Sequence, residues 1–286
     1  MSAALFPAAL MLASAIIHAI IGLWLKKARD KLVFRAILAL TTAAIIFPLV
    51  FFVPLPARAA WPYLIAGAVI HYIYQLSQIS AFERADMSLV YPVMRGTAPA
   101  LAAAIAFFSL DESLAPLEIT GLLLAAGALI AFGWPNKKRA IGWGAAMCFA
   151  ILCGVMIATY SVVDGAGMRV TREIQGEIWS YFVWFFMMDW VLIVPTVLIM
   201  RWRQLKTLIP QELKWGAIAG ASSLVTYGAA LIAFSLAPIG PMSAMRETSV
   251  VFGAVFAALF LKEQFGRRRI VFAAVLASGL ILMQFA

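Results

Sequence analysis

The chain has 286 residues, of which 64% are hydrophobic and only 12% are charged. Soluble domains usually carry about a quarter charged residues, so this composition excludes a water-soluble globular protein. The net charge of +9 could indicate a nucleic-acid-binding protein, but the basic residues occur in short segments between apolar runs and form no single basic stripe. We therefore expect a lipid bilayer, and no nucleic acid, around this protein.

Apolar runs of roughly 20 residues follow one another along the chain, and this length matches a helix that crosses the ~30 Å hydrocarbon layer of a bilayer. Strands of a membrane barrel need only about 10 residues and alternate in polarity, so a barrel is excluded. Helices satisfy their own backbone hydrogen bonds in lipid, and the sequence therefore predicts an all-α membrane protein of ten transmembrane helices. The predicted spans are 3–25, 32–54, 61–82, 86–109, 114–134, 140–162, 177–200, 214–236, 238–261 and 268–285.

The first span has no basic region before it and a basic group directly after it. A cleaved signal peptide has the opposite order, so we expect this helix to stay in the membrane. Every second loop is basic: together these loops hold 17 of the 22 Lys and Arg residues, whereas the other loops hold Arg58, Arg169 and Arg172. The positive-inside rule then predicts an inner-membrane protein with both termini in the periplasm. The basic set is Lys26, Lys27, Arg29, Lys31, Arg35, Arg84, Lys137, Lys138, Arg139, Arg201, Arg203, Lys206, Lys214, Lys262, Arg267, Arg268 and Arg269.

Two arginines, Arg95 and Arg246, lie inside predicted spans four and nine. A charged side chain at mid-membrane costs at least ~2.5 kcal/mol and normally faces a cavity or a partner. Two interpretations stay open: a guanidinium fork that binds an anionic substrate, or a neutralised structural pair that uses Glu247 or Asp189. Adjacent helical residues point about 100° apart, so Arg246 and Glu247 should face different neighbours. Pro92 and Pro99 flank Arg95 and predict a kink there.

An internal repeat relates the two halves of the chain when it is shifted by 151 residues, which aligns 81–132 with 232–283. Each half holds five spans, an odd number, so the second half must enter the membrane inverted. Folds of this kind bind their substrate near the midplane, between the halves. Both arginines lie about nine residues from opposite membrane faces, roughly 14 Å along a helix, and should therefore meet at one depth. Met94, Arg95, Thr97 and Glu112 align with Met245, Arg246, Thr248 and Glu263.

Other polar and aromatic residues are candidates for lining the same cavity. His71 and Gln75 are four residues apart and share one helix face, which suits a wet cavity. For each histidine or tyrosine the alternative is a hydrogen bond that joins two membrane helices. Asp189 and Glu247 are the candidates for carrying a coupling proton. The predicted substrate-binding set is Arg95, Arg246, Glu247, Thr97, Thr248, Tyr91, His71, Gln75, Tyr160, Tyr227 and His18.

Each half ends its fourth span with a Glu and continues through a short turn into a Gly/Ala-rich fifth span, in 'FFSLDESLAPLEITGLLLAAGALIAF' and 'ALFLKEQFGRRRIVFAAVLASGLILM'. These segments resemble the EamA-type members of the drug/metabolite transporter superfamily. The resemblance extends to 'IIHAIIGLWLKKARDKL', 'SLVYPVMRGTAPAL', 'YSVVDGAGMR' and 'MRETSVVFGAVFAALFLKE'. The resemblance implies two inverted five-helix EamA repeats, 2–136 and 137–286, and transport of small metabolites by alternating access. Some family members with similar segments are associated with the use of phosphonates. Many family members have a cytoplasmic N-terminus, whereas this charge pattern predicts the reverse.

The sequence thus predicts a secondary active transporter for a small anionic or zwitterionic metabolite, such as an amino acid, an organic acid or a phosphonate-like compound, with proton coupling as a hypothesis. A channel or a non-transporting sensor or scaffold is one alternative, although no filter-like sequence is present. A membrane-embedded enzyme is another, but the sequence contains no GxSxG, HExxH or Asp-rich motif. We expect no enzymatic activity, no cofactor and no metal, and a monomer or homodimer.

Overall fold

The structure, a computed structural model, describes residues 5–132, 143–261 and 267–284. This part of the chain is 89% helical and contains no strand. Its α-helices are α1 (Leu5–Lys27), α2 (Lys31–Ile46), α3 (Trp61–Arg84), α4 (Met87–Gly96), α5 (Ala98–Leu110), α6 (Pro116–Phe132), α7 (Trp143–Gln175), α8 (Trp179–Met188), α9 (Trp190–Arg201), α10 (Leu205–Leu236), α11 (Ile239–Arg246), α12 (Ser249–Leu261) and α13 (Arg267–Gln284). The short 3₁₀ helices η1 (Phe47–Phe51) and η2 (Trp202–Gln204) follow α2 and α9.

Five stretches of the described chain are long and apolar enough to cross a membrane. Two further apolar helical stretches, Pro116–Ala131 and Ala274–Met283, are shorter. Because such surfaces are stable in lipid and not in water, the chain is an all-helical, membrane-embedded protein. The five stretches are Phe6–Lys27, Lys31–Phe51, Leu89–Leu110, Trp143–Gln175 and Trp179–Leu236.

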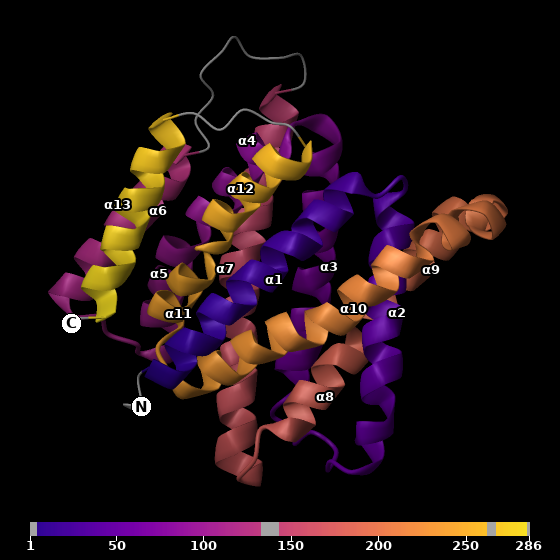
Figure 1. Cartoon of the computed structure of the whole chain (residues 1–286). Coiled ribbons are helices and arrows are strands. Elements are labelled where there is room, and N and C mark those ends of the chain that lie inside the picture. The colour runs from indigo at the N-terminus through magenta and orange to yellow at the C-terminus, as the bar shows by residue number, and fades with distance from the viewer. Residues whose placement is uncertain (1–4, 133–142, 262–266, 285–286) are drawn as a thin grey trace.

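The helices run up and down through the molecule, with connections at both of its ends (Figure 1). α1 and α3 end on the upper side of Figure 1, where α2, α4 and α7 begin, and both α2 and α7 end on the lower side. α3 packs along α7, α10 packs along α1 and α2, and α6 packs along α13. α7 also contacts α4, α5 and α10, so it lies at the centre of the packing.

Three predicted spans are interrupted helices. The fourth span consists of α4 and α5, which meet at Thr97. Pro99 causes this break because it has no N–H to donate to the carbonyl of Arg95, four residues earlier. Pro92 lies inside the uninterrupted α4, so the predicted kink occurs on the Pro99 side alone. The seventh span breaks between α8 and α9, and the ninth between α11 and α12.

Several predicted boundaries are wrong. The sequence predicts that the sixth span ends at 162, but α7 continues to Gln175 because its polar residues find partners in neighbouring helices. Arg169 and Arg172 donate to backbone carbonyls at the end of α10. That helix begins at Leu205, nine residues before the predicted start at 214. α2 ends at Ile46, short of the predicted 54, and η1 follows it. Glu263, Lys262 and the basic segment 137–139 lie outside the described residues.

Close approach of α7 to the break in α4–α5 depends on Gly154. A Cβ at this position would lie 2.7 Å from the backbone carbonyl of Met94 and would overlap the hydroxyl of Thr97. The helix pair α6 and α13 makes a similar contact, since a Cβ on Gly121 would lie 2.5 Å from the carbonyl of Gly279. Backbone contacts of this kind hold membrane helices together by dispersion, where lipid offers no hydrophobic driving force.

Substitution of Gly154 by alanine should therefore destabilise the protein. G154A introduces a methyl group against the backbone of α4, and overpacking of this kind costs about 1–3 kcal/mol. G144A is the matched control, because Gly144 lies on the same helix with nothing within 4 Å of its Cβ position. We expect the thermal unfolding midpoint in detergent to fall for G154A and to stay level or rise for G144A. Equal midpoints for the two variants would contradict this packing.

Candidate functional site

Arg95 and Glu247 form a buried ion pair between the two helix breaks. Arg95 lies in the last turn of α4, and Glu247 caps the end of α11. The guanidinium Nη1 is 3.0 Å from the carboxylate Oε1, and both side chains are about 1% exposed. His18 of α1 contacts the other guanidinium nitrogen, and the ring of Tyr91 lies 5.4 Å from the guanidinium carbon. The charge of Arg95 is therefore balanced inside the protein.

Arg246 occupies the last turn of α11 and has a different environment. Its Nη1 donates a hydrogen bond to the Tyr160 hydroxyl at 3.2 Å, and its guanidinium lies 4.9 Å from the ring centroid of Tyr227. The residue is 2% exposed, and its Nε has no hydrogen-bond partner among the described residues. The negative end of the helix dipole favours a cation at this position, as it does for Arg95 in α4. Arg246 thus keeps a free donor in a buried location.

Asp164 of α7 is a fully buried carboxylate surrounded by neutral or titratable donors. One oxygen accepts hydrogen bonds from His71 Nε2 at 2.8 Å and the Tyr227 hydroxyl at 2.5 Å. The other accepts from the Tyr181 hydroxyl at 3.1 Å. The imidazole of His71 also stacks on Tyr160, with ring centroids 4.1 Å apart.

A second ion pair lies at the break between α8 and α9. Arg35 Nη2 is 3.3 Å from Asp189 Oδ2, and the amide of Gln75 donates to the other oxygen at 2.7 Å. The charge pattern predicts a loop position for Arg35, and this is wrong because α2 begins at Lys31 and brings Arg35 to Asp189. Asp189, which has no charged neighbour in sequence, receives its partner from α2.

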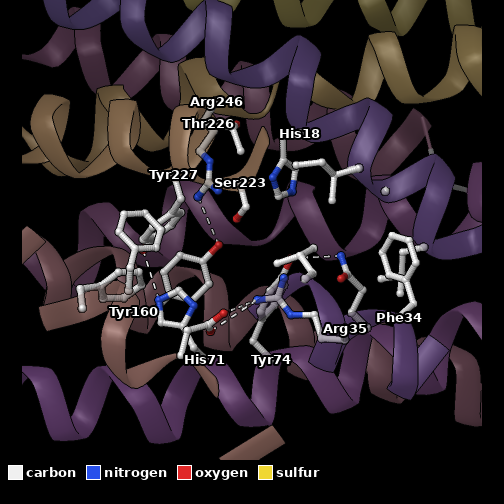
Figure 2. Close-up of a pocket in the computed structure, with 18 residues that line it drawn as sticks. His18, Phe34, Arg35, His71, Tyr74, Tyr160, Ser223, Thr226, Tyr227 and Arg246 are labelled. Atoms are coloured by element: carbon white, nitrogen blue, oxygen red, sulfur yellow. Dashed lines mark hydrogen bonds and ion pairs between the residues drawn. The ribbon is translucent and has the colours of Figure 1, made fainter. Parts of the chain in front are cut away.

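Arg246, His71 and the Arg35–Asp189 pair line a small cavity of about 50 Å³. A water molecule needs roughly 10–15 Å³ measured in this way, so the space holds a few waters or part of a small solute. In Figure 2, Arg246 and His18 lie on one side of the cavity, whereas Arg35, Tyr74 and His71 lie on the other. The lining residues are His18, Ile21, Gly22, Leu25, Phe34, Arg35, Leu38, His71, Tyr74, Gln78, Tyr160, Phe185, Phe186, Asp189, Ser223, Thr226, Tyr227 and Arg246.

Six of the residues predicted from the sequence line this cavity: His18, His71, Tyr160, Asp189, Tyr227 and Arg246. Arg95, Glu247, Tyr91 and Gln75 contact one another or a lining residue, but are not themselves in the lining. The expectation that Arg246 and Glu247 face different neighbours is confirmed.

Thr97 and Thr248 do not reach the cavity, because their hydroxyls donate to backbone carbonyls of the preceding helical turn. Each hydroxyl therefore bonds to the last turn of an interrupted helix, which is the local role that serine and threonine side chains often take. Among the described residues, no group of three or more His, Cys, Asp or Glu side chains is arranged to hold a metal ion.

Sequence reasoning missed Asp164, Tyr181 and Arg35. Asp164 stands inside the segment 'YSVVDGAGMR', just beyond the predicted end of the sixth span at 162 and before Arg169 of the predicted loop. The small residues instead allow close packing: a Cβ on Gly67 of α3 would lie 2.8 Å from the Asp164 carboxylate. An acidic residue among small residues just after an apolar run is the signal that could have identified this position.

No protein-family model matches the chain, and no curated protein matches it either. Among solved structures, 29 chains match. One of them, described only as the crystal structure of a protein, superposes on 99% of this chain and 96% of its own length with a TM-score of 0.72 at 15% sequence identity. The overall fold is therefore shared with a solved structure. At this low identity, the likeness shows the fold alone.

Removal of the carboxylate charge at Glu247 should destabilise the protein strongly. E247Q leaves the guanidinium of Arg95 buried without its counter-charge, and breaking a buried pair in this way costs about 3–5 kcal/mol. The double variant R95Q/E247Q should recover part of this loss. The thermal unfolding midpoint in detergent measures both effects.

The surface pair Glu83–Arg84 provides the control. Its atoms are 4.0 Å apart, with side chains 53% and 41% exposed. Exposed pairs contribute about 0–1 kcal/mol, so E83Q should leave the midpoint nearly unchanged. A loss in E247Q no larger than that in E83Q would show that the buried pair does not stabilise the fold.

Proposed function

We propose that the protein is a secondary active transporter for a small anionic or zwitterionic metabolite, such as an amino acid, an organic acid or a phosphonate-like compound. The observation that carries this proposal is Arg246, a buried guanidinium that lines the cavity and keeps an unbonded Nε. A guanidinium presents parallel N–H donors that match a carboxylate or phosphonate group. An anionic group beside Arg246 would satisfy this donor and balance its charge.

Transport by alternating access is supported by the interrupted helices at the cavity. Substrate sites of secondary transporters lie near mid-membrane, between discontinuous helices whose ends carry binding groups. Here the α8–α9 break carries Asp189, and the α11–α12 break follows Arg246 directly. The α4–α5 break follows Arg95, which binds Glu247 at the end of α11. A shift at any of these breaks would change contacts that line the cavity.

We further propose ten membrane crossings arranged as two inverted EamA repeats, 2–136 and 137–286. Helix boundaries support the repeat: α5 and α12 begin at Ala98 and Ser249. These two starting points differ by the same 151 residues that align the two halves of the sequence.

The proposed orientation puts the termini in the periplasm and the basic end of the molecule in the cytoplasm. α1 ends with Lys26 and Lys27, α3 ends with Arg84 and α13 begins with Arg267; these helix ends lie on the upper side of Figure 1. Short basic segments stay on the cytoplasmic side of an inner membrane, and this asymmetry supports the assignment.

Binding of an anionic or zwitterionic compound should depend on Arg246. We expect at least one amino acid, organic acid or aminophosphonate to raise the thermal unfolding midpoint of the purified protein, because a ligand that binds the native state stabilises it. R246Q should abolish this rise and the uptake of the same compound into proteoliposomes. R203Q, which changes an exposed arginine of η2, should retain both. A rise of equal size in R246Q would exclude Arg246 as the anion site.

The orientation can be tested with single cysteines in a variant that lacks Cys148 and Cys153. R203C should react with a membrane-impermeant maleimide only after the cells are opened, because it lies on the proposed cytoplasmic side. R58C should react in intact cells whose outer membrane has been permeabilised. The reverse pattern would invert the proposed topology without affecting the proposed site.

A further inference from the structure

The buried carboxylate of Asp164 has no arginine or lysine partner among the described residues. Its three hydrogen bonds come from His71, Tyr181 and Tyr227, and all three side chains can donate to an ionised carboxylate. A carboxylate needs a counter-charge in such surroundings, because an isolated ion in a medium of low dielectric is very costly. The arrangement therefore raises the question of which cation balances Asp164.

The three helices that donate hydrogen bonds to Asp164 bring it no arginine or lysine among the described residues. α3 contributes His71, α8 contributes Tyr181 and α10 contributes Tyr227. Arg169, five residues further along α7, is engaged by Glu112 at 2.6 Å. Arg246 of α11 is a further cation, and it contacts Tyr227, one of the donors to Asp164.

Arg246 is linked to Asp164 through two tyrosines. Its guanidinium lies over the ring of Tyr227, whose hydroxyl donates to Asp164. It also donates to the hydroxyl of Tyr160, which stacks on His71. The cation and the carboxylate are thus held near each other without direct contact.

A charge balance around the cavity follows from these contacts. Arg95 is paired with Glu247 and Arg35 with Asp189, so Arg246 and Asp164 are the cation and the anion that remain. With both histidines neutral, the site carries no net charge. Binding of a singly charged anion at Arg246 would leave the charge of Asp164 unbalanced, and this charge could be balanced by the uptake of one proton.

Three of the titratable groups near the cavity are poor acceptors for that proton. Protonation of Asp189 or Glu247 would break an existing ion pair. His18 contacts the guanidinium of Arg95, so a proton there would bring two cations together. His71, in contrast, lines the cavity and faces Asp164, where an imidazolium would form a charge-assisted hydrogen bond.

We propose that His71, held by Asp164, is a proton-binding site that gains one proton from the aqueous side of the cavity when an anionic group binds beside Arg246. The link to substrate binding rests on the proposed transport function, whereas the proton site itself can be tested without any substrate. Proton binding at His71 would make transport of an anion a proton symport. The proton is then assigned to His71 instead of Asp189 or Glu247, the candidates predicted from the sequence.

The chain contains only two histidines, so nitrogen NMR of purified protein with isotope-labelled histidine can follow each ring directly. H18Q assigns the two sets of signals. The variant R246Q removes the cation that balances Asp164. This removal imitates the neutralisation of Arg246 by a bound anion. We expect His71 to gain its proton at a pH about one unit higher in R246Q than in wild type, and R203Q to match wild type.

D164N provides the complementary test. Without the carboxylate, the imidazolium loses its counter-ion, and His71 should bind its proton only at a pH about one unit or more lower than in wild type. If D164N does not fold, R246Q still decides the question. An unchanged His71 titration in R246Q would overturn the link to Arg246, and an unchanged titration in folded D164N would overturn the role of Asp164. If no compound of the ligand screen stabilises the protein while the His71 titration shifts in both variants, the transport proposal is wrong and the proton site is retained.

Discussion

Charge neutrality inside a low-dielectric helix bundle is the constraint on which this structure depends. An uncompensated ion in such an interior costs several kcal/mol, and a group that cannot be paired must change its protonation or bind a counter-ion. Two pairs around the cavity meet this requirement directly, Arg95 with Glu247 and Arg35 with Asp189. Arg246 and Asp164 compensate each other's charge only across Tyr160 and Tyr227, without direct contact. This indirect compensation leaves the site able to respond to an added charge.

Helix geometry serves the same constraint. Arg95 and Arg246 each occupy the last turn of a short helix, where the carbonyl end of the helix dipole stabilises a cation. The breaks after these helices expose backbone groups that the hydroxyls of Thr97 and Thr248 partly satisfy. Gly154 lets the central α7 approach the first of these breaks. Backbone packing and charge placement are therefore two aspects of one arrangement.

Much of this organisation could be predicted from the sequence. Apolar run length identified an all-helical membrane protein, and the rarity of intramembrane charge selected Arg95, Arg246, Glu247 and Asp189 as important residues. Partners could not be predicted, because they come from helices far apart in the sequence: Glu247 lies 152 residues after Arg95, and Asp189 lies 154 residues after Arg35.

The missed residues have a common physical cause. Asp164 lies just beyond the predicted end of the sixth span, whereas tertiary hydrogen bonds from three helices support α7 through that segment. Hydropathy records the cost of placing such a residue in lipid, and it cannot record partners that remove this cost. Helix ends and buried charges are consequently the features for which a sequence pattern is least informative.

The most direct measurement of the charge balance is a calorimetric titration with the anion that stabilises the protein most, carried out in buffers of different ionisation enthalpy. The dependence of the binding heat on the buffer gives the number of protons exchanged per anion bound. Charge balance at His71 and Asp164 predicts uptake of about one proton for each singly charged anion. Binding with no proton exchange would contradict it.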